Sequence, residues 1–209
     1  MVASAAWGSR GLGEALAEGI EQYVIVGAGL DSFALRRPDL SSRLAIFELD
    51  HPGTQRAKRD RLASLARKLP DQLEFAPIDF EAEAVDAALA RSSFSGEKRA
   101  FFSWLGTVSY LSDEAVFSVL AALSSLASVG SQLVFDYAVP DDLLSDADRR
   151  MVVRLRRFTA RRGEPVGELG YRVLENLAPA EQDRRYFSDR SDGFSAFSGS
   201  YYVRLAVVA

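Results

Sequence analysis

The chain has 209 residues, a length that predicts a single domain. Hydrophobic residues make up 48% and charged residues 26% of the chain, so the composition excludes an intrinsically disordered protein. With no cysteine and one histidine, the sequence excludes disulfides, thiolate nucleophiles and metal centres built from Cys or several His, and the net charge of −4 provides no general attraction to nucleic acid or anionic membranes.

The location predicted from these features is the cytoplasm. Residues 1–22 lack a basic region followed by an apolar run, so we expect no export signal. Residues 115–135 carry no charge, but their many serines, their apolar spacing of three to four and Gly130 favour a helix followed by a strand over a membrane span.

Short apolar runs alternate with helical patterns along the whole chain. Strands are predicted at residues 23–26, 44–49, 73–78, 100–104, 133–139, 172–174 and 201–208, and helices at 52–68, 81–90, 112–128 and 141–162. This alternation predicts an α/β fold with a doubly wound, mostly parallel sheet.

The carboxyl ends of the predicted strands carry most of the candidate functional residues. These ends hold Gly27-Ala28-Gly29, residues 48–51, Asp79-Phe80 and residues 103–106. Because ligands of such sheets bind beyond the carboxyl ends of the strands, we expect these four segments to meet in one crevice.

The first two strand ends suggest a ligand with a ribose. Gly27 and Gly29 permit close approach of a ligand to the backbone, and Asp50 follows Gly29 by 50 − 29 = 21 residues, a separation that suits a carboxylate bonded to ribose hydroxyls. A dinucleotide fingerprint would have glycine at Ser32, and Asp31 would repel a diphosphate. The alternatives are an ordinary strand-to-helix turn for the glycines and a helix N-cap for Asp50.

The third strand end fits an adenine ring. Asp79 could accept a hydrogen bond from the adenine amino group while Phe80 packs on the ring, although Asp79 could equally cap a helix. A ribose acid and an adenine acid without a phosphate-binding device describe a nucleoside that carries no phosphates, and S-adenosylmethionine fits this description.

Four segments together resemble one family. The runs 24–34, 47–52, 77–80 and 103–106, with Tyr110-Leu111, resemble the leucine carboxyl methyltransferase-like family of class I S-adenosylmethionine-dependent methyltransferases over roughly residues 22–139. The resemblance implies one Rossmann-like domain over 1–209, with about seven strands and an antiparallel last strand, that methylates an oxygen of a small molecule. The cofactor-binding residues that we predict are Gly27, Ala28, Gly29, Asp31, Glu48, Asp50, His51, Asp79, Phe80, Ser103, Trp104 and Leu105.

The chain departs from the family pattern at three places. Leu105 stands where many members have glutamate, with Ser103 or the backbone as its replacement. Residues 1–21 form a shorter N-terminal segment than usual, in which Arg10 is poorly spaced to replace an arginine that meets the cofactor. Residues 140–170, which include the basic stretch 149–162, form a reduced substrate cap.

The catalytic residues are not assigned by the sequence. A carboxylate acceptor needs no general base, whereas a hydroxyl acceptor would take one from His51, Asp31 or Tyr110. For His51 a capping role is favoured, and Trp104 and Tyr110 fit the core at least as well as a pocket wall. Expected partners are a small-molecule acceptor and a second copy of the chain, rather than nucleic acid or a membrane.

Two other functions compete with methyl transfer. A degenerate cofactor-binding or interaction protein is suggested by Leu105 and the reduced cap. A nicotinamide-dependent oxidoreductase is suggested by Gly27-x-Gly29 and the later acid, but Ser32 and the lack of a Tyr-x-x-x-Lys pair disfavour it.

Overall fold

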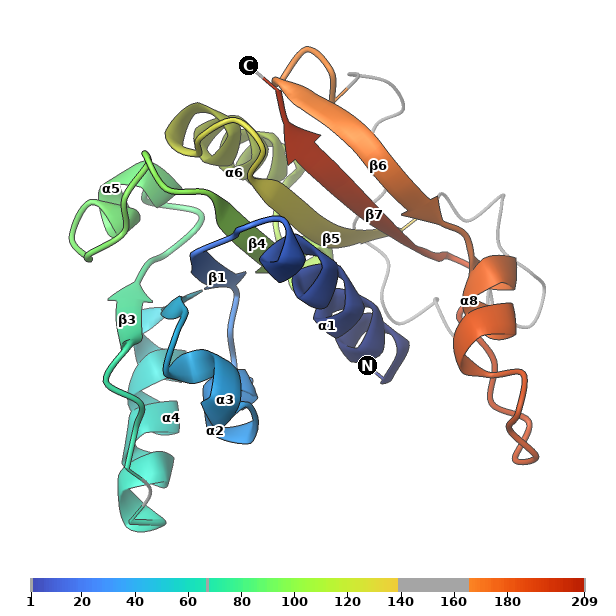
Figure 1. The fold of residues 1–209 in the computed structure, drawn as a ribbon, viewed down its shortest axis with the longest axis horizontal. Helices are drawn as coiled ribbons and strands as arrows, with labels where there is room; N and C mark the ends of the chain where they lie inside the picture. Colours follow the sequence, from blue (N-terminus) through green and yellow to red (C-terminus); the bar gives the residue numbers. More distant parts are fainter. Residues whose placement is uncertain (1, 67, 139–165, 209) are drawn as a thin grey trace.

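A seven-stranded sheet forms the centre of the computed structural model, which describes residues 2–66, 68–138 and 166–208 (Figure 1). The strand order is β3-β2-β1-β4-β5-β7-β6, and of these described strands only β7 runs opposite to the others. The strands are β1 Gln22–Val26, β2 Ala45–Asp50, β3 Leu73–Pro77, β4 Ala100–Trp104, β5 Gln132–Ala138, β6 Tyr171–Leu177 and β7 Ser200–Val207. The predicted fold class, including the antiparallel last strand, is confirmed.

Helices cover both faces of the sheet. The helices are α1 Val2–Ala17, α2 Phe33–Arg36, α3 Pro38–Ser41, α4 Pro52–Ser64, α5 Val85–Leu89, α6 Asp113–Leu126 and α8 Pro179–Tyr186, with a 3-10 turn η1 Val108–Tyr110. Alternate residues of β1 show the two layers, since Tyr23 and Ile25 pack with α1 and α2 while Val24 and Val26 pack with α5 and α6. The carboxyl ends of β1 to β5 remain at one edge between these layers.

Helix α1 differs from the expectation for the N-terminal segment, for which no helix was predicted. Its glycines lower helix propensity, but they allow close packing on the sheet. A Cβ at Gly11 would lie 3.3 Å from the Phe101 ring, and one at Gly8 would lie 3.1 Å from Leu105 Cδ1. Packing of Trp7 and Leu12, both almost fully buried, outweighs the local cost.

Other boundaries also differ. Helix α8 was not predicted, α4 ends at Ser64, and the helix expected at 81–90 shortens to α5. The uncharged run 115–135 divides at Gly130 into α6 and β5, and none of the helices in the described ranges is long and apolar enough to cross a membrane. The helix expected at 141–162 and the basic stretch lie outside the described residues, whereas 166–170 form turns before β6.

Candidate functional site

The glycine loop after β1 is fastened to both neighbouring strands. The N–H groups of Gly27 and Ala28 donate to the Leu49 carbonyl at 2.8 and 3.0 Å, which ties the loop to β2. Gly27 has φ +69°, and a Cβ there would lie 2.2 Å from Thr107 Oγ1, in the segment after β4. Position 27 therefore requires glycine both for its backbone angle and for the close approach of two loops.

Asp50 ends β2 with its carboxylate held by two backbone donors. The N–H of Gly29 donates to Oδ2, and the N–H of His51 donates to Oδ1 at 2.6 Å. Gly29 has φ +50°, a left-handed conformation that favours glycine. A carboxylate offers about four acceptor positions, so this half-buried group is fixed in direction and can still accept further hydrogen bonds.

Asp79 follows β3 next to Asp50. The Ile78 N–H donates to the Asp50 carbonyl at 2.9 Å, which joins the two strand ends. Asp79 Oδ1 accepts from the Glu81 N–H at 3.1 Å within a turn, whereas the N-cap of α5 is Ala84, so the helix-capping role considered for Asp79 is wrong. The side chain of Asp79 is exposed and Phe80 is half-buried against the core, and adenine binding by the pair stays a prediction.

Asp31 and His51 both use acceptor atoms for capping. Asp31 Oδ1 accepts from the Phe33 N–H at 2.5 Å, so a carboxylate occupies the start of α2, where a dinucleotide fold places its diphosphate. His51 is the N-cap of α4, and its Nδ1 accepts from the Gly53 N–H at 3.2 Å. The third candidate base, Tyr110, is 72% exposed.

Glu48 does not join Asp50 at the open edge. Its carboxylate is 1% exposed and forms an ion pair with Lys58 of α4, which is also buried. Burial raises the pKa of Glu48, and the Lys58 ammonium opposes this rise. The Glu48 carbonyl also accepts from Gln55 Nε2 at 2.7 Å, so the residue fastens α4 to β2.

The end of β4 contributes mainly buried groups. The Ser103 hydroxyl bonds the Tyr23 hydroxyl, whose pKa burial raises, and Trp104 is fully buried. Leu105 is half-buried and packs in the apolar cluster beside α1. Leu105 thus brings no polar group to the edge, and its backbone is what it can offer to a ligand.

Arg10 of α1 is committed elsewhere. Its guanidinium lies 3.1 Å from a Glu175 carboxylate oxygen on β6 and 3.6 Å from Glu14. The poor spacing expected for Arg10 as a cofactor ligand agrees with this placement.

Asp136, near the end of β5, is a candidate that the sequence reasoning missed. Its Oδ1 accepts from the Gly106 N–H at 2.8 Å, and burial raises its pKa above the usual aspartate value. The sequence did contain a signal for Asp136, because it is an acid inside the apolar run 133–139. It stands near the carboxyl end of a predicted strand, as Asp50 and Asp79 do.

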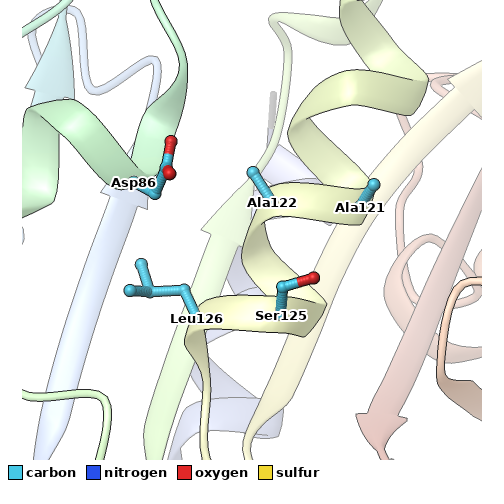
Figure 2. A pocket seen from close by; sticks show the side chains of 5 residues that line it. All are labelled: Asp86, Ala121, Ala122, Ser125 and Leu126. Carbon is cyan, nitrogen blue, oxygen red and sulfur yellow. The ribbon is translucent and has the colours of Figure 1, made fainter.

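A separate groove lies between α5 and α6, on the face of the sheet opposite α1 (Figure 2). It has a volume of about 360 Å³ and is lined by Asp86, Ala121, Ala122, Ser125 and Leu126. Its lining holds none of the predicted site residues.

Comparison with known proteins identifies the family. A family model of leucine carboxyl methyltransferases matches residues 1–124. The chain belongs to this family. It is 33% identical over 215 residues to the "putative S-adenosyl-L-methionine-dependent methyltransferase YktD" of Bacillus subtilis (strain 168), covering 97% of this chain and 70% of that protein. A relative of the same description from Mycobacterium marinum is 31% identical over 83% of this chain and 52% of its own length.

Solved structures of methyltransferases share the fold. The mitomycin 7-O-methyltransferase MmcR has a TM-score of 0.59 at 15% identity, over 91% of this chain and 50% of its own. Magnesium protoporphyrin IX methyltransferase from Synechocystis, solved with bound S-adenosylhomocysteine, has a TM-score of 0.57 at 13% identity, over 99% and 84%. The predicted family and the Rossmann-like methyltransferase fold are therefore confirmed, and the predicted cofactor agrees with the names of the relatives. The chain spans about half the length of the mycobacterial relatives.

Proposed function

We propose that this chain binds S-adenosylmethionine across the ends of β1, β2 and β3 and transfers its methyl group to an oxygen of a small molecule. The observation that carries the proposal is the Asp50 carboxylate, which the N–H groups of Gly29 and His51 fix beside the glycine loop. A carboxylate held in this way can accept hydrogen bonds from two ribose hydroxyls.

The residues present fit this cofactor better than a dinucleotide. Gly27 and Gly29 add no side chains to the loop and the intervening Ala28 is buried, while Asp79 with Phe80 stands at the end of β3 for the adenine. Asp31 places a negative charge at the start of α2, which opposes a diphosphate but not a cationic sulfonium. This local charge weakens the oxidoreductase alternative.

The work of the protein in this reaction is binding and orientation. When bound, the cofactor supplies an electrophilic methyl group on sulfur, so no covalent intermediate with the enzyme is required. Asp50 would fix the nucleoside half, the glycine loop would lie against the remaining part of the cofactor, and the backbone after β4 would border the reacting end. Holding acceptor and donor in line accounts for much of the rate in such displacements.

Calorimetric titration tests the proposal. Wild-type protein is titrated with S-adenosylmethionine and S-adenosylhomocysteine, with NAD and NADP for comparison, and Asp50→Ala is measured beside Asp86→Asn in the remote groove. We expect binding of the methyl-donor pair alone, at least about 100-fold weaker in Asp50→Ala because hydrogen bonds to a charged group are lost, and unchanged in Asp86→Asn. Equal affinity in Asp50→Ala would overturn the site, and binding of NAD alone would overturn the function.

A non-catalytic cofactor-binding protein is the second candidate. The observations that favour it are Leu105, which packs among apolar side chains, and Arg10, which is paired with Glu175. This alternative predicts binding of S-adenosylhomocysteine without methyl transfer to any acceptor, and detection of a methylated product would reject it.

A further inference from the structure

The order of the strands gives the bound cofactor a direction, and the inference that follows rests on the function proposed above. Adenine belongs at β3, ribose at β2 and the remaining part of the cofactor at the β1 loop, and the next strands in the sheet are β4 and β5. A cofactor that lies along this edge with its adenine at β3 has its sulfonium end directed toward β4 and β5. The acceptor must therefore approach from the β4–β5 end.

Asp136 is the described carboxylate that stands at that end. It lies on β5, and its Oδ1 is held by the N–H of Gly106 at 2.8 Å. The adjoining residue Thr107 packs against Gly27, with 3.5 Å between Thr107 Oγ1 and the Gly27 carbonyl oxygen. A continuous set of contacts thus connects the glycine loop to Asp136.

The state of Asp136 suits proton transfer. The side chain is half-buried, so part of it remains exposed, and burial raises its pKa above that of an ordinary aspartate, which makes its carboxylate a stronger base. Asp31 and His51 likewise accept from backbone N–H groups, but they lie on the β1–β2 side.

We propose that Asp136 is the general base of the reaction and that the acceptor is a hydroxyl group rather than a carboxylate. The hydroxyl oxygen uses a lone pair to form the new bond to the methyl carbon, and the carbon–sulfur bond breaks with its electron pair staying on sulfur. The hydroxyl proton passes to the Asp136 carboxylate and then to water. The products are a methyl ether, a neutral thioether and one proton.

The charge of Asp136 also selects the acceptor. A carboxylate acceptor needs no base, and placing it against a second partly buried carboxylate costs free energy through like-charge repulsion. A neutral hydroxyl avoids this repulsion and gains a hydrogen bond to the base. Phenols are suitable probes because their protons are the easiest of the neutral hydroxyls to remove.

The test uses the full chain with S-adenosylmethionine labelled in its methyl group. A panel of substituted phenols is compared with benzoic acids that carry the same substituents, and Asp136→Asn is compared with Asp86→Asn. Asparagine keeps an oxygen that can accept from the Gly106 N–H but cannot take the proton. We expect label in phenols and not in benzoates, a kcat about 10²- to 10⁴-fold lower in Asp136→Asn, and S-adenosylhomocysteine affinity within about twofold of wild type.

Three results would overturn the inference. Transfer to benzoates as fast as to phenols removes the hydroxyl assignment, and so does transfer to none of the phenols. A loss of S-adenosylhomocysteine affinity in Asp136→Asn that matches the loss of rate makes Asp136 a cofactor ligand. If wild-type protein fails to bind S-adenosylhomocysteine at all, the proposed function itself fails, so the two failures are distinguishable.

Discussion

The two ends of the sheet's carboxyl edge use their polar side chains in different ways. At the β1–β2 end, Asp31, Asp50 and His51 each accept a hydrogen bond from a backbone N–H that belongs to the loop or helix nearby. At the β4–β5 end, Asp136 also accepts from a backbone N–H, that of Gly106, and burial raises its pKa. The β1–β2 end is therefore a fixed frame, in which side chains are held in place by backbone hydrogen bonds. The β4–β5 end holds a carboxylate whose raised pKa suits it to accept a proton.

This difference matches the division of labour in a group transfer. A cofactor that binds in every cycle benefits from a rigid site, because preorganised groups lose little freedom on binding. An acceptor needs a group that changes its protonation during the reaction.

The largest expected effect comes from the buried ion pair behind the frame. Lys58→Met leaves the Glu48 carboxylate buried without its partner, which typically destabilises a protein by about 3–5 kcal/mol. The pKa of Glu48, already raised by burial, rises further in this variant. A group with a raised folded-state pKa stabilises the fold below its unfolded-state pKa, and this contribution is lost as pH increases through the folded-state value.

Urea unfolding at several pH values measures this prediction. The destabilisation by Lys58→Met should be large at neutral pH and smaller in mild acid, where Glu48 is protonated. The double variant Glu48→Gln with Lys58→Met should recover part of the loss, because no unpaired charge remains. A destabilisation of Lys58→Met that does not change with pH would show that the pair contributes by packing and not by charge.

A pair of glycines compares the two loops directly. Gly27→Ala places a methyl group 2.2 Å from Thr107 Oγ1 at φ +69°, whereas Gly106→Ala meets nothing within 4 Å at φ +75°. Both variants carry the backbone strain, about 1–2 kcal/mol, and Gly27→Ala adds overpacking of about 1–3 kcal/mol. In thermal unfolding, the midpoint temperature of Gly27→Ala should be lower than that of Gly106→Ala. The affinity for S-adenosylhomocysteine should be lost mainly in Gly27→Ala. Equal losses of stability and of S-adenosylhomocysteine affinity in the two variants would mean that the contact between Gly27 and Thr107 contributes to neither.

The parts of the fold that the sequence predicted are those with a local signal. The strand ends at Gly27, Asp50 and Asp79 were recognisable because an apolar run stops at a glycine or an acid in each case. Alternation of strands and helices then predicted the parallel sheet. Within the candidate site, the proximity of these three strand ends follows from that topology alone.

The parts that were missed depend on contacts between distant residues. Helix α1 is stabilised by packing of Trp7 and by the close approach of Gly8 to Leu105 and of Gly11 to Phe101, which local propensity cannot report. The pairing of Glu48 with Lys58 depends on where α4 crosses the sheet. Asp136 gained its environment from the Gly106 N–H, 30 positions earlier in the chain, although its strand-end position was readable.

The smallest effect is expected at His51, and it tests the contrast between the two ends. His51→Ala removes the side chain that caps α4, which should cost about 1 kcal/mol of stability. His51→Ser should restore most of that stability, since serine is a strong N-cap. If the β1–β2 end only holds the cofactor, methyl transfer per folded molecule should be nearly unchanged in both variants. Chemical unfolding combined with the labelled-methyl assay measures both quantities, and a kcat loss of 100-fold or more in His51→Ser with intact S-adenosylhomocysteine binding would move the base from Asp136 to His51.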